Sequence, residues 1–369
     1  MALIHPRGDP ASRIWIILDH PFPSDIPKGY CLSGGMGYVY EKMFAEAGMS
    51  LFNCYVCARR PDTDSPMSYA SVDNALENYQ PPCIFVVNEV GSYYFPEMRP
   101  RSIKEDYKTQ LNKYVGSLLH SNILSFAHYM MPIYGPDKCA QDWAERNTTT
   151  YVDLQKMNDE FQYWKKAGCL QPLPQRTLIH HDNIELRDLL THFDRFSRAR
   201  FLSNDIETVY PKADSAFYPH PGYAIVIGLA DSKDFGVSFR LFRDSPAENR
   251  ILWRAYDEIL HDANIIGQNF INFDLYYQQA LGFSIRLQKV QDTMVRHQIL
   301  WPELSHKLQF MTRQYTRQPY YKDENKHWNI KHLNPLMHYN ALDVTVTFEV
   351  FLGQEEEFKD RPHLKGEVA

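Results

Sequence analysis

The sequence is poor in paired cysteines and in long apolar runs, and each shortage excludes a class of protein. Only Cys54 and Cys57 among six cysteines form a Cys-x-x-Cys pair. A zinc site needs a second pair or two histidines at ligand spacing, so none is expected and the cysteines are interpreted as reduced cytosolic thiols. The best apolar runs, Ile14–Leu18 and 223–230, are far shorter than the ~18 residues of a membrane helix.

The N-terminal segment and the charge exclude further classes. The first twelve residues lack the apolar core of a secretory signal, so we expect a cytoplasmic protein without membrane contact. A net charge of −6 argues against holding nucleic acid by bulk electrostatics. With 44% hydrophobic and 23% charged residues, the chain is neither disordered, collagen-like nor a coiled coil. Its aromatic content of 14% suits core packing or, alternatively, stacking of unpaired bases.

The 369 residues suffice for about two domains. In the first half, short strands alternate with helices, which is typical of α/β layers around a mainly parallel sheet. We expect strands at Ile14–Leu18, 51–56 and Cys83–Val87, and helices at 38–47, 111–119 and 153–166. A segment with Gly168, Pro172 and Pro174 follows and predicts a linker. The predicted domains are therefore 1–170 and 176–369.

The second half also mixes strands and helices. Strands are predicted at Thr177–His180, 201–206, 223–230, 236–241 and Asn264–Gly267, and helices at 184–196, 249–261 and 273–281. Asn334 is the expected N-cap of the last helix, with Pro335 at its first position.

Three segments of the second half carry carboxylates. Asp205 and Glu207 end a strand, where residues two apart face the same side and can bind one cation. Asp274 follows Gly-Gln-Asn-Phe-Ile-Asn-Phe at the junction of a short strand and a helix. Tyr339 and Asp343 are four residues apart, hence on one helix face. Taken singly, each has a plain alternative: a solvated strand end, an Asp that stabilises the first helical turn, and a half-buried Tyr beside a surface Asp.

Together, the order of these segments resembles the three motifs of the DnaQ-like (DEDD) exonuclease superfamily, which has an RNase H-like fold. The family pattern is D-x-E on the first strand, N-x(2–3)-[F/Y]-D at a helix start, and Y-x-x-x-D on a late helix. The resemblance covers about residues 176–352. Asn-x-x-Asn-Phe-Asp-Leu looks most like the proofreading domains of family B polymerases. The stretches 291–294 (QDTM), 315–316 (YT) and 319–324 (PYYKDE) look like phage-type exonucleases, which implies a viral source and a host-cytoplasmic location.

The resemblance implies a metal-dependent reaction. Phosphodiester hydrolysis needs an activated water and stabilisation of the leaving oxygen, which two divalent ions supply. Carboxylates suit Mg²⁺ or Mn²⁺. By resemblance, Asp205, Glu207 and Asp343 hold one ion, and Asp205 with Asp274 holds the other.

Three further roles follow from the same resemblance. Tyr339 orients or deprotonates the attacking water. Asn269 and Phe273, together with neighbouring aromatic residues, seat the terminal nucleotide of the substrate.

The first half resembles bacterial uracil-DNA glycosylases, a three-layer α/β family. The pieces that match are Asp19-His20-Pro21, a Gly-rich helix entry at 33–37, Arg60-Pro61, the turn at 132–136 and the Val-Asp-Leu at 152–154. Another three-layer α/β domain is the alternative.

The departures from the glycosylase pattern concern its chemistry. Gly135 stands where the family has a histidine that stabilises the uracil anion, and losing such a donor costs orders of magnitude in rate. Cys57 and Ala58 occupy the region of the uracil-reading asparagine, and the four-cysteine iron–sulfur pattern is absent. We therefore expect a catalytically degenerate fold kept for DNA contact or partner docking. Arg59, Arg60 and His128 are expected to be solvated surface side chains, with phosphate contacts as the alternative.

The sequence thus predicts a glycosylase-like α/β domain followed by an RNase H-like α/β exonuclease domain. The expected activity is that of a metal-dependent 3′–5′ DNA exonuclease that releases nucleoside monophosphates from single-stranded or frayed 3′ ends, in proofreading or replication. The chain beyond Asp343 is too short for a polymerase domain, so any polymerase is expected to be a separate chain or a part of the protein outside this sequence. The alternatives are a DEDD ribonuclease, a bifunctional glycosylase–exonuclease and a non-catalytic replication scaffold.

Overall fold

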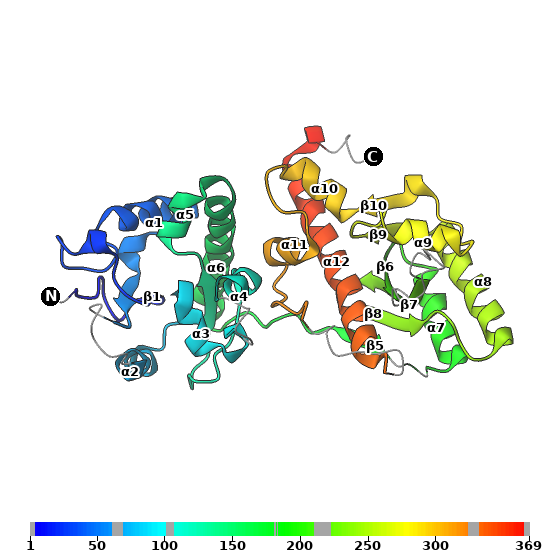
Figure 1. Cartoon of the computed structure of the whole chain (residues 1–369), viewed down its shortest axis with the longest axis horizontal. Helices are drawn as coiled ribbons and strands as arrows, with labels where there is room; N and C mark the ends of the chain where they lie inside the picture. Colours follow the sequence, from blue (N-terminus) through cyan, green and yellow to red (C-terminus); the bar gives the residue numbers. More distant parts are fainter. Residues whose placement is uncertain are drawn as a thin grey trace, which may run out of the picture. The chain divides into compact units, whose positions relative to one another are not determined.

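The computed structural model describes residues 4–60, 69–100, 107–180, 182, 184–209, 223–323 and 332–364. It divides into two compact units (Figure 1). Unit 1 consists of Met1–Leu173 and Arg317–Tyr320, and unit 2 of Pro174–Thr316 and Tyr321–Ala369. Two residues of the motifs quoted above, Pro61 and Glu324, lie outside the described residues.

Unit 1 is built on a four-stranded parallel sheet with the order β2-β1-β3-β4. The strands are β1 (Ile14–Leu18), β2 (Tyr55–Ala58), β3 (Cys83–Val87) and β4 (Tyr129–Ile133). Every residue of β1, β3 and β4 is buried, as expected for a parallel sheet covered on both faces. The helices are α1 (Gly35–Glu46), α2 (Tyr69–Tyr79), α3 (Gly91–Tyr94), α4 (Tyr107–Tyr114), α5 (Pro136–Gln141) and α6 (Thr148–Ala167).

Two element predictions for unit 1 were wrong. The strand expected at 51–56 begins only at Tyr55, because Leu51–Asn53 forms a 3-10 turn. The helix expected at 111–119 is α4, which ends at Tyr114. Gly116 follows with a φ of 76°, a left-handed conformation that glycine adopts easily and that ends helices.

The surface interpretation of two basic residues in unit 1 was also wrong. Arg59 is only 3% exposed, and its Nη1 lies 3.4 Å from Oδ1 of Asp19. His128 is 2% exposed, and its ring nitrogens contact the Ser121 amide and the Phe126 carbonyl. Buried charged or polar side chains need such partners, so both residues belong to the polar contacts inside the unit and not to its surface.

Unit 2 contains a six-stranded mixed sheet with the order β10-β9-β6-β7-β8-β5. The strands are β5 (Thr177–His180), β6 (Phe201–Val209), β7 (Tyr223–Ser232), β8 (Phe235–Arg240), β9 (Asn264–Gly267) and β10 (Val290–Asp292). Pairing is antiparallel along β6-β7-β8 and parallel for β5 with β8, β9 with β6 and β10 with β9.

Helices cover both faces of this sheet (Figure 1). They are α7 (Leu186–Phe196), α8 (Pro246–Asp262), α9 (Asp274–Ala280), α10 (Thr293–Leu300), α11 (Leu308–Tyr315) and α12 (Asn334–Asp360). Leu202 and Ile206 of β6 join a core cluster with α7 and α8, whereas Phe201 packs with Phe351 of α12. Because neighbouring strand residues alternate in direction, the odd-numbered side chains of β6 face α12. Both units are therefore mixed α/β structures.

The start of α12 differs from the prediction. Asn334 is already helical, and Leu333 is the N-cap. The Asn334 side chain is unavailable for capping because its Oδ1 accepts a hydrogen bond from the Asp182 amide (2.9 Å). Pro335 still lies in the first turn, where its missing N–H costs nothing.

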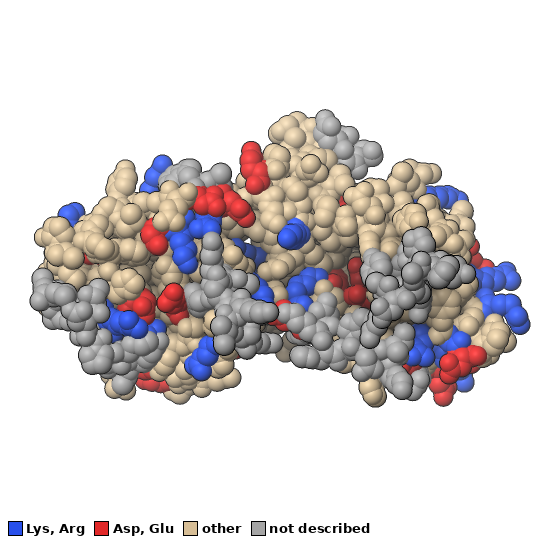
Figure 2. Space-filling model, viewed as in Figure 1, with Lys and Arg blue, Asp and Glu red and all other residues tan. Residues whose placement is uncertain are grey.

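The surface carries charges of both signs, in line with the amino-acid composition. In the view of Figure 2, basic and acidic side chains are interspersed, with no large field of one sign among the residues drawn in colour. Within the described ranges, none of the helices combines the length and apolar composition that crossing a membrane requires. All six cysteines are free, and only Cys169 is exposed.

Candidate active site

The predicted carboxylates of the D-x-E segment lie on β6. Asp205 and Glu207 both point toward the α12 face, as the alternation along a strand requires. Ile206, between them, is 4% exposed and packs into the core on the other face. The pairing of β6 with β7 shifts register between Glu207 and Thr208, immediately after the two acids.

Helix α12 brings the third carboxylate to this face. Asp343 is 5% exposed, and carboxylate oxygens of Asp205, Glu207 and Asp343 all lie within 4.8 Å of one another. Tyr339 lies one turn earlier on the same helix and is 6% exposed. The structure therefore assembles four of the five predicted catalytic residues around one point.

A glycine permits the close approach of α12 to the sheet. Gly228 of β7 pairs with Asp205 in the strand register. A Cβ at position 228 would lie 2.5 Å from Oδ1 of Asn340, so any larger residue would push the helix away. The fully buried Asn340 donates from Nδ2 to Oδ2 of Asp205 (2.7 Å) and accepts from the Ser238 hydroxyl (2.8 Å). Asn340 thus orients the Asp205 carboxylate.

Asp274 approaches β6 from the start of α9. It is 2% exposed, and its Oδ1 accepts a hydrogen bond from the Ile206 amide (2.9 Å). It is not part of the group of three oxygens within 4.8 Å. Burial, followed by the negative charge of Asp205, raises the pKa of Asp274 well above its ordinary value. The two acids are therefore close enough to interact electrostatically.

The acids of the cluster repel one another in the absence of a divalent ion. Although Asp205 and Glu207 are only half-buried as residues, their carboxyl groups are desolvated. Desolvation and the charge of Asp343 raise the pKa of Asp205 to about 7. Desolvation, then the charges of Asp205 and Asp343, raise the pKa of Glu207 well above its usual range. An all-oxygen donor set of this kind fits hard divalent ions such as Mg²⁺ or Mn²⁺.

The phenol of Tyr339 is held in its protonated form. Burial, and next the negative charge of Asp343, raise the pKa of Tyr339 far above its ordinary value. A phenol that keeps its proton at neutral pH can orient a water through a hydrogen bond but is a poor general base. Of the two roles that the resemblance implied for Tyr339, this electrostatic setting favours orientation.

Two further residues at the cluster were quoted in the sequence but given no role. The Tyr321 hydroxyl donates to Oδ1 of Asp343 (2.5 Å). The Lys322 ammonium group donates to both oxygens of Asp343 (2.8 and 2.6 Å) and to the Tyr339 hydroxyl (2.7 Å). Their only sequence signal was membership of the 319–324 stretch, because nothing local shows that this stretch reaches α12.

The predicted substrate-binding residues lie on the loop between β9 and α9. Asn269 has a φ of 56°, a left-handed conformation that asparagine tolerates better than most residues. Asp292 connects this loop to the start of α10. Its carboxylate accepts hydrogen bonds from the amides of Asn269 (3.0 Å), Ile271 (3.1 Å) and Met294 (2.9 Å). Phe273 is half-buried against Tyr277, with ring centroids 4.9 Å apart.

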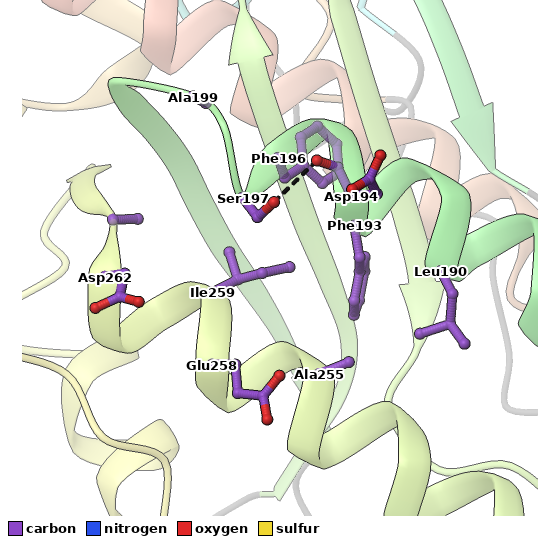
Figure 3. A pocket seen from close by; sticks show the side chains of 11 residues that line it. Leu190, Phe193, Asp194, Phe196, Ser197, Ala199, Ala255, Glu258, Ile259 and Asp262 are labelled. Carbon is purple, nitrogen blue, oxygen red and sulfur yellow. Dashed lines mark hydrogen bonds between the residues drawn. The ribbon is translucent and has the colours of Figure 1, made fainter.

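A separate groove lies between α7 and α8 (Figure 3). Its cavity of about 390 Å³ is floored by apolar side chains such as Phe193 and Ile259. Asp194, Glu258 and Asp262 line it as well, and none of the predicted site residues does. Carboxylates repel phosphate, so this groove is a poor path for nucleic acid.

The sequence of unit 2 matches a known family. Residues 231–355 match the model of a family described as 3′-5′ exonuclease. The match includes Asp274, Tyr339 and Asp343, whereas Asp205 and Glu207 precede it. The chain therefore carries a 3′–5′ exonuclease domain of the DnaQ-like (DEDD) type, and such domains are hydrolases that use divalent metal ions. No curated protein matches the chain.

Several solved structures are similar to the chain. The catalytic core of RRP6 from Trypanosoma brucei is 14% identical with a TM-score of 0.41, covering 54% of this chain and 54% of that one. The Nibbler EXO domain of Aedes aegypti is 12% identical with a TM-score of 0.38 (52% and 94%). Escherichia coli RNase D, an exoribonuclease, is 15% identical with a TM-score of 0.36 (52% and 48%). This chain thus spans about half the length of the RRP6 core and of RNase D.

Proposed function

We propose that this chain is a metal-dependent 3′–5′ exonuclease that acts on DNA and releases nucleoside monophosphates, in a proofreading or replication-associated role. The observation that carries the proposal is the carboxylate cluster of Asp205, Glu207 and Asp343 beside Tyr339. The family match supports the 3′–5′ polarity. The choice of DNA rests on the resemblance of the stretches 291–294 and 319–324 to phage-type exonucleases.

In this proposal, the carboxylates would hold two Mg²⁺ or Mn²⁺ ions, one at Asp205, Glu207 and Asp343, and one at Asp205 with Asp274. Such ions would supply activation of the attacking water and stabilisation of charge on the leaving 3′ oxygen. The chain prepares the site through hydrogen bonds that hold the carboxylates in place, from Asn340 to Asp205 and from the Ile206 amide to Asp274.

The remaining residues act on the water and the substrate. Tyr339, which keeps its proton, orients the attacking water. Asn269 and Phe273, on the loop held by Asp292, seat the terminal nucleotide of a single-stranded or frayed 3′ end. A separate polymerase chain would supply such ends during replication.

The test uses single-stranded DNA and RNA of matched sequence, labelled at either end, with Mg²⁺, Mn²⁺ or EDTA. We expect stepwise release of mononucleotides from the DNA 3′ end that EDTA abolishes. Asp205→Asn should be inactive, whereas Asp234→Asn, in the exposed turn between β7 and β8, should be fully active. Faster digestion of RNA would establish the ribonuclease alternative, and release from 5′ ends or activity in EDTA would refute the proposal. An inactive wild-type chain would favour the scaffold alternative.

For unit 1 we propose a glycosylase-like fold without glycosylase activity that contacts DNA or the polymerase partner. Gly135, the N-cap of α5, donates from its amide to Oδ1 of Asn88 (2.9 Å). A Cβ at position 135 would lie 2.3 Å from Nδ2 of Asn88 and 2.4 Å from Oδ1 of Asp137. These neighbours fill the space into which the family histidine would project. Asp19 is engaged with His20 and Arg59, and its pKa is lowered chiefly by the His20 hydrogen bond.

A further inference from the structure

Lys322 places a positive charge on the carboxylate cluster. It lies in the turn that follows Tyr321, and its side chain is 19% exposed. Both oxygens of Asp343 accept hydrogen bonds from its ammonium group (2.8 and 2.6 Å). The nitrogen also lies 4.8 Å from the ring centroid of Tyr339 and 5.2 Å from that of Tyr321, so two aromatic rings flank the cation.

The charge of Lys322 acts on the whole cluster and not on Asp343 alone. It lowers the pKa of Asp205 and that of Glu207, against the raising effects of burial and of the neighbouring acids. Lys322 therefore partly neutralises three carboxylates that would otherwise repel one another without a metal ion. The ammonium group supplies one positive charge where a divalent ion would supply two.

The same position is incompatible with a metal ion that binds Asp343 fully. Magnesium demands oxygen ligands at about 2.0–2.1 Å in near-octahedral geometry. Here one oxygen of Asp343 already accepts from Lys322 and Tyr321, and the other accepts from Lys322. Two cations at one carboxylate also repel each other strongly in a poorly solvated site. A metal ion that binds both oxygens of Asp343 therefore competes with Lys322 for them.

We propose that Lys322 is an internal competitor for the metal: it occupies Asp343 in the metal-free protein and leaves that carboxylate when a divalent ion binds. The lysine side chain is long and flexible, and it projects from a turn, so it can swing away without unfolding an element. Lys322 thereby sets the metal affinity of the cluster. The proposal rests on the metal site of the proposed function but not on the substrate of the enzyme.

The first measurement is the affinity for Mn²⁺ by isothermal titration calorimetry, without nucleic acid. Lys322→Met keeps the length of the side chain and removes the charge. We expect it to bind Mn²⁺ at least tenfold more tightly than the wild-type chain, which corresponds to about 1.4 kcal/mol. The control is Lys289→Met, because Lys289 lies on the same unit but bonds to the Asp262 carbonyl. The control should bind Mn²⁺ as the wild type does.

The second measurement needs no variant, so a folding defect of Lys322→Met cannot obscure it. An amine-reactive label is applied to the wild-type chain in EDTA and in saturating Mn²⁺, and the labelled lysines are mapped by mass spectrometry. We expect Lys322 to react slowly in EDTA and severalfold faster with Mn²⁺, while Lys289 is unchanged.

The outcomes separate this inference from the proposed function. Equal or weaker Mn²⁺ binding by folded Lys322→Met, or labelling of Lys322 that does not accelerate with Mn²⁺, would overturn the inference even if the wild-type chain digests DNA. If neither protein binds Mn²⁺, the metal site fails and the proposed function fails with it. Digestion of RNA in place of DNA would change the substrate and leave the inference intact.

Discussion

In the metal-free protein, Asp205→Asn is expected to raise the free energy of unfolding at pH 8. Burial and the charge of Asp343 raise the pKa of Asp205 from 3.8 to about 7. Between these values the folded chain keeps a proton that the unfolded chain has lost, so stability falls as the pH rises and the loss is complete above about pH 7. A shift of about three units corresponds to at most ~4 kcal/mol at pH 8 and to roughly 2 kcal/mol at pH 5.

The assay is urea denaturation in EDTA at pH 5 and pH 8. Asp205→Asn replaces the carboxylate by a neutral group of the same shape. The variant should therefore be more stable than the wild type at pH 8, and the difference in stability should be smaller at pH 5. Asp234→Asn, an exposed site, should show no such difference. Divalent ions should reverse the order by stabilising the wild type, which binds them. A variant that is less stable at pH 8 in EDTA, or a difference that is independent of pH, would refute the reasoning.

Four other outcomes are expected. Asp205→Ala or Asp343→Ala should lower the single-turnover rate of 3′ nucleotide release by several orders of magnitude, whereas Tyr339→Phe should leave a measurable remainder; near-normal rates for either Asp variant would contradict the assignment. Gly228→Ala should destabilise the chain in urea by about 1–3 kcal/mol through its clash with Asn340, while Gly35→Ala, where a Cβ meets nothing within 4 Å, should not. Asp292→Ala should lower the free energy of unfolding by roughly 1–3 kcal/mol, because three amides lose their acceptor, and it should raise the KM for oligonucleotides. An unchanged KM would mean that the loop with Asn269 does not seat the substrate. The full chain should release no uracil from a uracil-containing duplex, and release would revive the bifunctional alternative.

Local patterns in the sequence determined several of the strands and the faces on which the acids lie. Ile14–Leu18 and Cys83–Val87 are continuous apolar runs, and the structure has strands with these same limits. The spacing of two between Asp205 and Glu207 puts both on one face of β6 for the simple reason that strand residues alternate. The spacing of four between Tyr339 and Asp343 likewise puts both on one side of α12. These periodicities extend over only a few residues, so they can be recognised in the sequence without knowledge of the fold.

Only the tertiary structure decided which distant residues complete the site. Asn340 contacts a carboxylate 135 positions away because Gly228 lets α12 settle close to the sheet. Lys322 meets Asp343 because its turn folds back on that helix. The same holds for Arg59, whose burial depends on the partner Asp19 across neighbouring strands, and for Asn334, whose side chain bonds to the Asp182 amide instead of capping its helix. Such contacts arise when separate elements pack against each other. The residues next to either partner in the sequence do not show which elements will pack together.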